Sequence, residues 1–238
     1  MVEIKLMHKS PFNVVHQKLD ANFGIFDGWS LPADFGDTGA ESKALSESCA
    51  VVDLCSFGRI QISGKAAKET INTLFSAENG KIRPDSWAWA KPIDYNGKTL
   101  CRIFRLNGGY TLLTQPSQTD SLCQWVQSAA EEGVSVTNVT NKTAMLGLYG
   151  PKAFDSMRGV LPFDIDHLDT GDVEKISFMM LSFTLLRGSW LDTEGLELIC
   201  PAAAGPLAAG AVAKYRHKHN ITPAGMDSLR RAIQQHHE

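Results

Sequence analysis

The sequence predicts an α+β fold made of two copies of one ferredoxin-like unit, and three observations lead to this prediction. Four segments share a pattern in which an apolar run is followed by a Gly or Pro turn and a helical stretch of small residues. The first and third segments are about 85 residues apart, as are the second and fourth, a spacing typical of tandem duplication. The dipeptide Asn96-Gly97, between two further apolar runs, predicts a hairpin. The four segments begin at Arg59, Gly109, Ala144 and Leu196.

Residues 1–54 differ from this pattern and are predicted to form a leader that packs on the body. We expect a helix over residues 11–22, a long loop rich in Gly and Asp, and a second helix over residues 41–50. The loop contains four aromatic side chains, a composition that argues against disorder. Two interpretations of the loop stay open, namely that it faces a ligand or that it packs the leader onto the sheet.

The body, residues 55–238, is predicted to divide into a first half of about 55–140 and a second half of about 141–238. Each half has the order strand, helix, strand, strand, helix, which is the split βαβ order of ferredoxin-like folds. Helices packed on one side of such sheets give the α+β class. The further strands that complete the units are expected at residues 87–92, 100–106 and 176–186.

Composition and charge exclude several classes of function. The chain has 238 residues and a net charge of -3, with Lys and Arg scattered along it, so the basic face of a nucleic-acid-binding protein is not expected. No apolar run reaches the roughly 18 residues of a membrane span. The N-terminus lacks the apolar core of a signal peptide, which favours a cytoplasmic protein. The five cysteines form no CxxC pair and the histidines show no i, i+4 pair, so no metal site is predicted.

The segment RGSWLDTEGLELICP, which begins at Arg187, places the carboxylate of Glu197 inside an apolar run. Because side chains alternate between the faces of a strand, Glu197 could simply point to solvent between Leu196 and Leu198. The alternative is that the carboxylate faces a ligand. The residues of this segment alone do not decide between the two interpretations.

Five segments in their order along the chain resemble the folate-binding family of the glycine-cleavage T-protein, an aminomethyltransferase. The resemblance implies a ring-like body with tetrahydrofolate in a central cavity and one-carbon chemistry at the reduced pterin. It implies that Glu197, Arg187 and Trp190 bind the folate, and that Phe23 and Trp29 of the leader loop lie against it. The segments are SPFNVVHQKLDANFGIFDGW from Ser10, VVDLCSFGRIQISG from Val51, LGLYGPKA from Leu146, RGSWLDTEGLEL from Arg187 and AGMDSLRRA from Ala224.

The chemistry of a pterin agrees with the role that the resemblance gives to Glu197. The 2-amino-4-oxo edge of a pterin presents a ring N–H and an exocyclic amine side by side. A carboxylate accepts both groups at once, as it would from a guanidinium. The flat ring also needs apolar or aromatic faces, which Trp190 or Phe23 would supply.

The sequence departs from the family in three places that matter for function. Where the family has a pair of acids, one of which serves the one-carbon transfer, this chain has Leu100 and Cys101. Where the last motif of the family has an arginine, this chain has Met226. The chain ends at Glu238, where typical members continue into a C-terminal barrel domain. Without that barrel we expect an exposed apolar surface, covered by another subunit of a homo-oligomer or of a larger complex.

Three functions remain open from the sequence. The first is a tetrahydrofolate-dependent methyltransferase that takes its methyl group from a corrinoid protein or from a small methylated oxygen, sulfur or nitrogen compound. Its candidate catalytic residues are Asp192, Cys101 and Asp53. The second is a non-catalytic folate-binding subunit of an oxidase or demethylase complex. The third is a scaffold that keeps the fold and has lost the folate.

Overall fold

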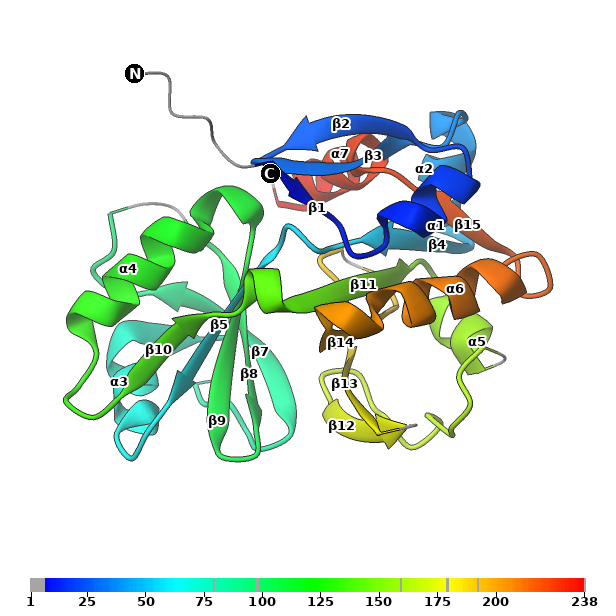
Figure 1. Ribbon diagram of the computed structural model, residues 1–238. Helices are drawn as coiled ribbons and strands as arrows, with labels where there is room; N and C mark the ends of the chain where they lie inside the picture. Colours follow the sequence, from blue (N-terminus) through cyan, green and yellow to red (C-terminus); the bar gives the residue numbers. More distant parts are fainter. Residues whose placement is uncertain are drawn as a thin grey trace, which may run out of the picture.

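The computed structural model describes residues 7–78, 80–96, 99–158, 160–178, 180–191 and 193–237. In this part of the chain, one three-stranded sheet and two six-stranded sheets form the body of the molecule (Figure 1). Helices cover the outer faces of the two large sheets, whose inner faces lie toward each other. The α+β prediction is confirmed.

The leader forms the small sheet, which the sequence analysis did not predict. The prediction of a helix over residues 11–22 and a loop after it was wrong in part, because α1 (Asn13–Lys18) ends early and a hairpin follows. Asp27 and Gly28 both have positive φ, 50° and 82°, as a type I′ hairpin turn requires. The strands are β1 (His8–Lys9), β2 (Asn22–Phe26) and β3 (Trp29–Asp34), in the order β1-β3-β2.

The second leader helix is α2 (Thr38–Glu47), and it is followed at once by β4 (Cys49–Asp53). The helix predicted over residues 41–50 therefore ends too late, because the helix in the structure ends at Glu47. Ser48 leaves the helical conformation with φ near -141°, and the β-branched pair Val51 and Val52 continues as a strand. β4 lies inside one of the large sheets, so the leader contributes a strand to the body as well as a covering layer.

The first large sheet is antiparallel throughout and is built from the first half of the body. Helices α3 (Ala67–Leu74) and α4 (Thr119–Ala129) cover one face of it, and a separate apolar core fills the space between. A 3-10 turn, η1 (Pro116–Gln118), leads into α4. The strands, in order across the sheet, are β10 (Ser135–Asn138), β5 (Gly58–Ser63), β9 (Gly109–Thr114), β8 (Cys101–Leu106), β7 (Ser86–Pro92) and β6 (Phe75–Ala77).

The second large sheet takes five strands from the second half and one from the leader. Its order is β12 (Val173–Phe178), β13 (Leu181–Arg187), β14 (Gly195–Pro201), β11 (Thr143–Tyr149), β4 and β15 (Ile221–Ala224). All pairs are antiparallel except β15 with β4. The helices of this half are α5 (Ala153–Arg158), α6 (Gly205–Tyr215) and α7 (Met226–His237), with 3-10 turns η2 (Thr140–Lys142) and η3 (Ala202–Ala204).

The two large sheets repeat one neighbour order, as the duplication predicted. Strands β5, β9, β8 and β7 correspond to β11, β14, β13 and β12. The single strand expected at residues 176–186 is instead the hairpin β12–β13, which turns at Met180 with φ near 64°. The predicted Asn96-Gly97 turn lies partly outside the described residues, since Gly97 is not among them, and β7 and β8 do pair as that hairpin requires.

Candidate functional site

Glu197 lies in the middle of β14, between Gly147 of β11 and Leu186 of β13. Its side chain is fully buried, so the interpretation that it points to solvent is excluded. Register determines the direction in which it points. Paired residues of neighbouring strands share a face, and the face of Glu197 is the one toward the first large sheet.

Arg102 of β8 meets Glu197 from the opposite sheet and is also fully buried. Its Nη1 donates to Oε1 of Glu197 at 3.0 Å, and its Nη2 donates to Oε2. Two parallel N–H···O bonds of this kind form the strongest geometry available to a carboxylate. The ion pair therefore occupies both oxygens of Glu197 and joins the two sheets.

Tyr149 of β11 completes the hydrogen bonding of this carboxylate. Its hydroxyl donates to Oε1 of Glu197 at 2.5 Å. Burial and the adjacent negative charge raise the pKa of Tyr149 well above its ordinary value, which keeps the phenol protonated as a donor. Gly147 makes this contact possible, because a Cβ there would lie 2.9 Å from the ring of Tyr149.

Three tryptophans surround the guanidinium of Arg102, and we call Trp87, Trp89 and Trp190 the indole box. The Arg102 Cζ lies 4.5 Å from the ring centroid of Trp87, 5.1 Å from that of Trp190 and 5.7 Å from that of Trp89. At such distances a cation is attracted to the face of an aromatic ring.

Neighbouring residues fix the indole box in place. Trp87 donates from Nε1 to the carbonyl of Arg187 at 2.9 Å, and its ring lies over Gly188. A Cβ at Gly188 would come within 2.2 Å of that ring, so the position needs glycine. Trp190 packs edge-to-face on Trp89, with 5.5 Å between the centroids.

A cavity of about 270 Å³ lies between the sheets next to this cluster. Phe104 and Ile199 line it, each two residues beyond Arg102 and Glu197 on the same strand face. Polar side chains of both sheets, including Thr111 and Thr184, line it as well. This space is large enough for part of a small ligand.

The arrangement does not fit a pterin on Glu197. Both carboxylate oxygens already accept from Arg102, and the same guanidinium occupies the faces of the indole box. Two buried N–H groups of the cluster, Nε of Arg102 and Nε1 of Trp190, have no hydrogen-bond partner among the described residues. Oε1 of Glu197 accepts from Arg102 and Tyr149, and Oε2 accepts from Arg102, so a pterin would have to compete with Arg102 for this carboxylate.

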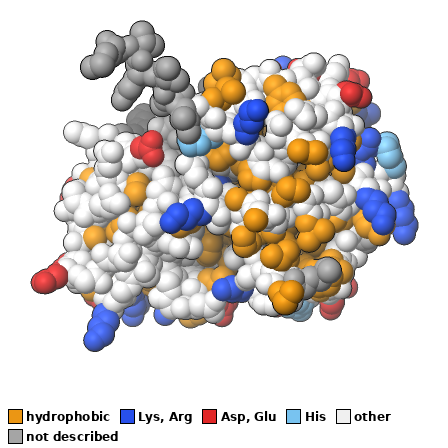
Figure 2. Space-filling model, in the orientation of Figure 1, with side chains coloured by type: hydrophobic (Ala, Val, Ile, Leu, Met, Phe, Trp, Pro, Cys, Tyr) orange, Lys and Arg blue, Asp and Glu red, His pale blue; other side chains and the backbone are white. Residues whose placement is uncertain are grey.

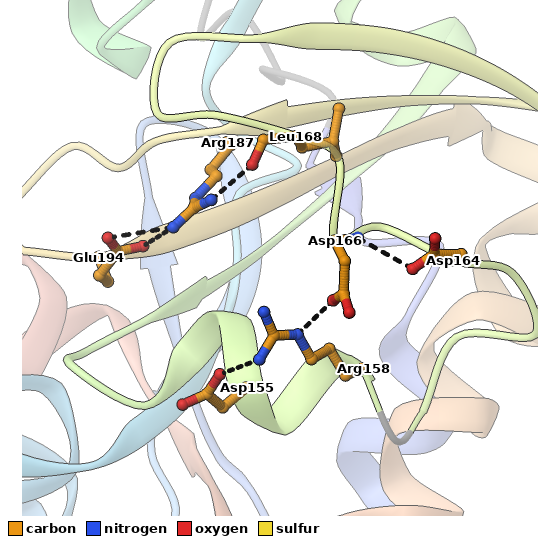
Figure 3. Close-up of polar contacts among 7 residues, drawn as sticks. All are labelled: Asp155, Arg158, Asp164, Asp166, Leu168, Arg187 and Glu194. Atoms are coloured by element: carbon orange, nitrogen blue, oxygen red, sulfur yellow. Dashed lines mark hydrogen bonds and ion pairs between the residues drawn. The ribbon is translucent and has the colours of Figure 1, made fainter.

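Of the predicted folate-binding residues, the structure brings only Glu197 and Trp190 together. Arg187 pairs with Leu196 and therefore lies on the opposite sheet face. There its Nη1 donates to the carbonyl of Leu168 at 2.5 Å and its Nη2 lies 3.5 Å from Glu194 (Figure 3). Its Cζ lies 3.9 Å from the ring centroid of Phe154.

Phe23 and Trp29 are likewise separate from Glu197, because both belong to the small leader sheet. Phe23 is 39% exposed on β2, with its ring 6.5 Å from that of His16. Trp29 is buried on β3, with its ring 5.1 Å from that of His8. Of the two interpretations of the leader loop, the structure favours packing.

The candidate catalytic residues have structural surroundings where they are described. Cys101 precedes Arg102, so it points to the other face of β8 and into the core beneath α3 and α4. Burial raises the pKa of its thiol to about 12, and its Sγ lies 3.2 Å from the carbonyl of Ala90. Asp192 lies outside the described residues.

Asp53, the third candidate, is buried at the end of β4 and contacts α1 through His16. Its Oδ2 lies 2.8 Å from Nε2 of His16, and its Oδ1 accepts from the backbone N–H of Cys55 at 2.8 Å. Burial alone would raise the pKa of Asp53, but the hydrogen bonds and charge of His16, with those from Ser10 and Cys55, outweigh it and lower the pKa. Asp53 is therefore ionised, and both of its carboxylate oxygens have hydrogen-bond partners.

Sequence reasoning missed four members of the cluster, namely Arg102, Tyr149, Trp87 and Trp89. A signal existed for three of them. Arg102 lies in an apolar strand sequence, LCRIF, where a buried cation requires an acidic partner. Trp87 and Trp89, two apart in a strand, had to share one face. Nothing in the sequence placed Tyr149 beside Glu197.

In the part of the chain that the structure describes, no group of three His, Cys, Asp or Glu side chains could hold a metal ion. All five cysteines are free and buried. None of the helices searched there is both long and apolar enough to cross a membrane.

Comparison with protein families gives a match to the GCVT N-terminal domain over residues 12–232. The aminomethyltransferase of Halalkalibacterium halodurans is 24% identical over 237 residues, which cover 97% of this chain and 64% of that protein. The aminomethyltransferase of Desulforamulus reducens is 26% identical over 241 residues, with the same coverage. The chain thus spans less than two thirds of the length of these relatives.

Two solved structures share the fold. The glycine cleavage system aminomethyltransferase T from Bartonella henselae matches with a TM-score of 0.83 and 15% identity, covering 95% of this chain and 62% of that one. A chain of the heterotetrameric sarcosine oxidase from Corynebacterium sp. U-96 matches with a TM-score of 0.54 and 15% identity, covering 76% of this chain and 92% of that one.

Proposed function

The chain belongs to the GCVT N-terminal domain family, and we propose that it acts as a non-catalytic subunit of a larger oxidase or demethylase complex. The observation that carries this proposal is the ion pair of Arg102 with Glu197. Glu197 is the carboxylate that the family resemblance assigns to the pterin. In this chain both of its oxygens accept hydrogen bonds from the side chain of Arg102.

A guanidinium and the 2-amino-4-oxo edge of a pterin offer the same pattern of two adjacent N–H donors. The two groups therefore compete for Glu197, and Arg102 has the advantage of being attached to the protein. Removing one partner from a buried ion pair typically costs about 3–5 kcal/mol. A reduced folate would have to supply at least that free energy before it gained any affinity.

The surroundings of the other candidate residues support a non-catalytic role. Cys101 is protonated at neutral pH and faces the core of the first half. Asp53 is held by His16 and by the backbone of Cys55. Neither residue is available as a proton acceptor for one-carbon transfer.

The role as a subunit draws support from the sarcosine oxidase match. That enzyme is heterotetrameric, and the present chain covers 92% of the matched chain. A chain consisting almost entirely of this fold is thus part of a larger oxidase. We propose an equivalent position for the present protein, beside a partner that carries the chemistry.

A second candidate function is tetrahydrofolate-dependent methyl transfer from a small methylated donor. It is favoured by the cavity of about 270 Å³ between the sheets and by the aminomethyltransferases among the relatives. Under this alternative, reduced folate would enter only in a conformation in which Arg102 has left Glu197.

Anaerobic calorimetric titration with tetrahydrofolate tests the proposal. The parent chain is compared with three variants, Arg102→Ala, Arg102→Lys and Arg105→Ala. Arg102→Lys keeps the positive charge but lacks the two parallel N–H donors of the guanidinium. Arg105 is a matched control on the same strand, where it lies over Tyr110 and has no contact with Glu197. We expect no saturable binding by the parent or by Arg105→Ala up to millimolar ligand.

Micromolar binding of tetrahydrofolate by the parent chain would overturn the proposal and leave methyl transfer as the better candidate. Binding by the Arg102 variants alone would identify Arg102 as the reason for the closed site. If no variant binds and circular dichroism shows that all are folded, the scaffold interpretation stands, and the role as a subunit is unaffected.

A further inference from the structure

Helix α6 has the composition of a buried helix but lies on the surface. Its sequence, GPLAAGAVAKY, contains a single charged residue, Lys214. Ala209 and Val212 pack inward, whereas Leu207 is 52% exposed. Helices that are apolar all round are normally covered. The outer side of α6 therefore lacks the polar side chains that a solvent-facing helix would have.

Helix α1 extends this apolar surface, since it packs alongside α6 and exposes Val14 by 56%. Figure 2 shows hydrophobic side chains gathered over this part of the molecule, with Lys and Arg side chains along the border. We call this surface the α1–α6 face. Its exposed or half-buried apolar members are Val14, Val15, Pro206, Leu207, Ala208 and Ala211.

The border of the α1–α6 face is positively charged, although the chain as a whole carries a net charge of -3. Residues 201–220 contain no Asp or Glu, while Lys214 and Lys218 are exposed at the end of α6. Lys18, at the end of α1, is exposed as well. Electrostatic complementarity requires a partner surface with carboxylates beside its apolar residues.

A small cavity lies beneath this face, between α1, α6 and β4. Its volume of about 30 Å³ suits a group the size of a carboxylate. His16 and Arg216 line it, and the Nδ1 of His16 and the Nε of Arg216 have no hydrogen-bond partner in the described part of the chain. The other ring nitrogen of His16 is engaged by Asp53 at 2.8 Å.

A carboxylate in this cavity would accept from Nε–H of Arg216 and would lie beside Nδ1 of His16, the two buried nitrogen atoms of its lining that have no partner in the described part of the chain. Its negative charge would face the guanidinium of Arg216. We propose that the α1–α6 face binds a partner protein that presents an apolar segment with Asp or Glu beside it, one carboxylate entering the cavity at His16. This inference rests on the proposed role as a subunit and specifies the chemistry of the partner.

Two other occupants agree less well with the observations. Helices that lie on membranes carry Trp or Phe on the apolar side and several Lys or Arg on the other, whereas α6 has no Trp or Phe and only Lys214. A second copy in a two-fold contact would place this face against itself. Neither α1 nor α6 contains an Asp or Glu to offer to the cavity.

Photo-crosslinking tests the inference. Benzoylphenylalanine is placed at Leu207 of the full chain, and the protein is irradiated in extract of its source organism. The same group at Met180, which is fully exposed on the β12–β13 turn, is the control. We expect an adduct at position 207 with one other protein, through an apolar peptide that contains Asp or Glu.

Charge-reversal variants test whether the crosslinked partner is bound through the basic residues of the α1–α6 face. We expect Lys214→Glu with Lys218→Glu to lower its yield at least tenfold, and Arg216→Gln to lower it several-fold. The matched pair Lys65→Glu with Lys68→Glu, exposed lysines of the other half, should leave it unchanged. Circular dichroism confirms that each variant is folded.

The inference fails if the adduct is a second copy of this chain, if it is insensitive to charge reversal, or if its yield does not exceed that of the Met180 control. It also fails if the purified chain instead sediments with vesicles of anionic phospholipid and the Leu207→Glu variant does not. A folate titration reports on the proposed function separately, because Leu207 and Arg216 are not among the residues around Glu197.

Discussion

Arg102 and Glu197 are 95 residues apart in the sequence, and their side chains form a two-point ion pair that joins the two large sheets. Both side chains are fully buried, so neither charge has water as an alternative partner. The fold and the candidate site therefore depend on the same contact.

Breaking the ion pair from one side is expected to destabilise the protein strongly. Arg102→Met or Glu197→Leu alone should lower the free energy of unfolding by about 3–5 kcal/mol, because each leaves a buried charge without a partner. The double variant should lose much less than the sum, since an apolar pair avoids both costs. Urea unfolding of all four proteins gives the coupling free energy. Additive losses would show that the two charges do not depend on each other.

Free guanidinium is expected to restore part of the stability that Arg102→Ala loses. The substitution removes the planar cation from the indole box and leaves Glu197 in place as its acceptor. Millimolar guanidinium chloride should raise the thermal midpoint of this variant by about 2–4 °C for each kcal/mol of binding, relative to equal sodium chloride. The parent chain and Arg105→Ala are controls. An equal response in all three proteins would argue against a specific site.

The pH dependence of stability should reveal Asp53. Its folded pKa lies below the ordinary value of 3.8, so the unfolded state takes up the proton first as the pH falls. The stabilisation from this carboxylate is complete above about pH 4 and is lost as the pH falls through the folded pKa. Urea unfolding between pH 7 and pH 2 should show a shallower acid loss for Asp53→Asn than for the parent. Asp20→Asn, at an exposed site, should behave like the parent.

The thiol of Cys101 is expected to be inert in the folded protein. Its pKa of about 12 and its burial leave almost no thiolate at pH 8. Ellman's reagent should therefore react slowly with the native chain and rapidly with all five cysteines in urea. Cys101→Ser should give the same native trace. Fast stoichiometric labelling at Cys101, located by peptide mapping, would reopen its candidacy as a catalytic group.

The sequence was most informative where local patterns determine structure. Alternating apolar residues predicted most strands of the body, and the repeat spacing predicted that the two large sheets would correspond. The leader was harder because β2 and β3 are short and their Asp27-Gly28 turn resembled part of a loop. The helix predicted over residues 41–50 also extended past the start of β4, since no local pattern indicates that Cys49 belongs to a strand.

The candidate site was predictable only in part, because it depends on register between distant strands. Glu197 and Trp190 were identified from one segment and do lie together around Arg102. Arg187 belongs to the same segment but points to the other sheet face, since it pairs with Leu196. That pairing, and the approach of Arg102 from the opposite sheet, arise from tertiary structure, although a cation in the apolar strand sequence LCRIF indicated that Arg102 needs an acidic partner.

The position of β4 has a consequence for how the protein is made. β4 is synthesised early, but its neighbours in the sheet are β11, from the middle of the chain, and β15, from near its end. During translation the first large sheet can close around its own core while β4 still has both edges unpaired. The second sheet can be completed only when the last strand has left the ribosome. We therefore expect the nascent chain to need protection by chaperones at β4 until β11 and β15 have been synthesised.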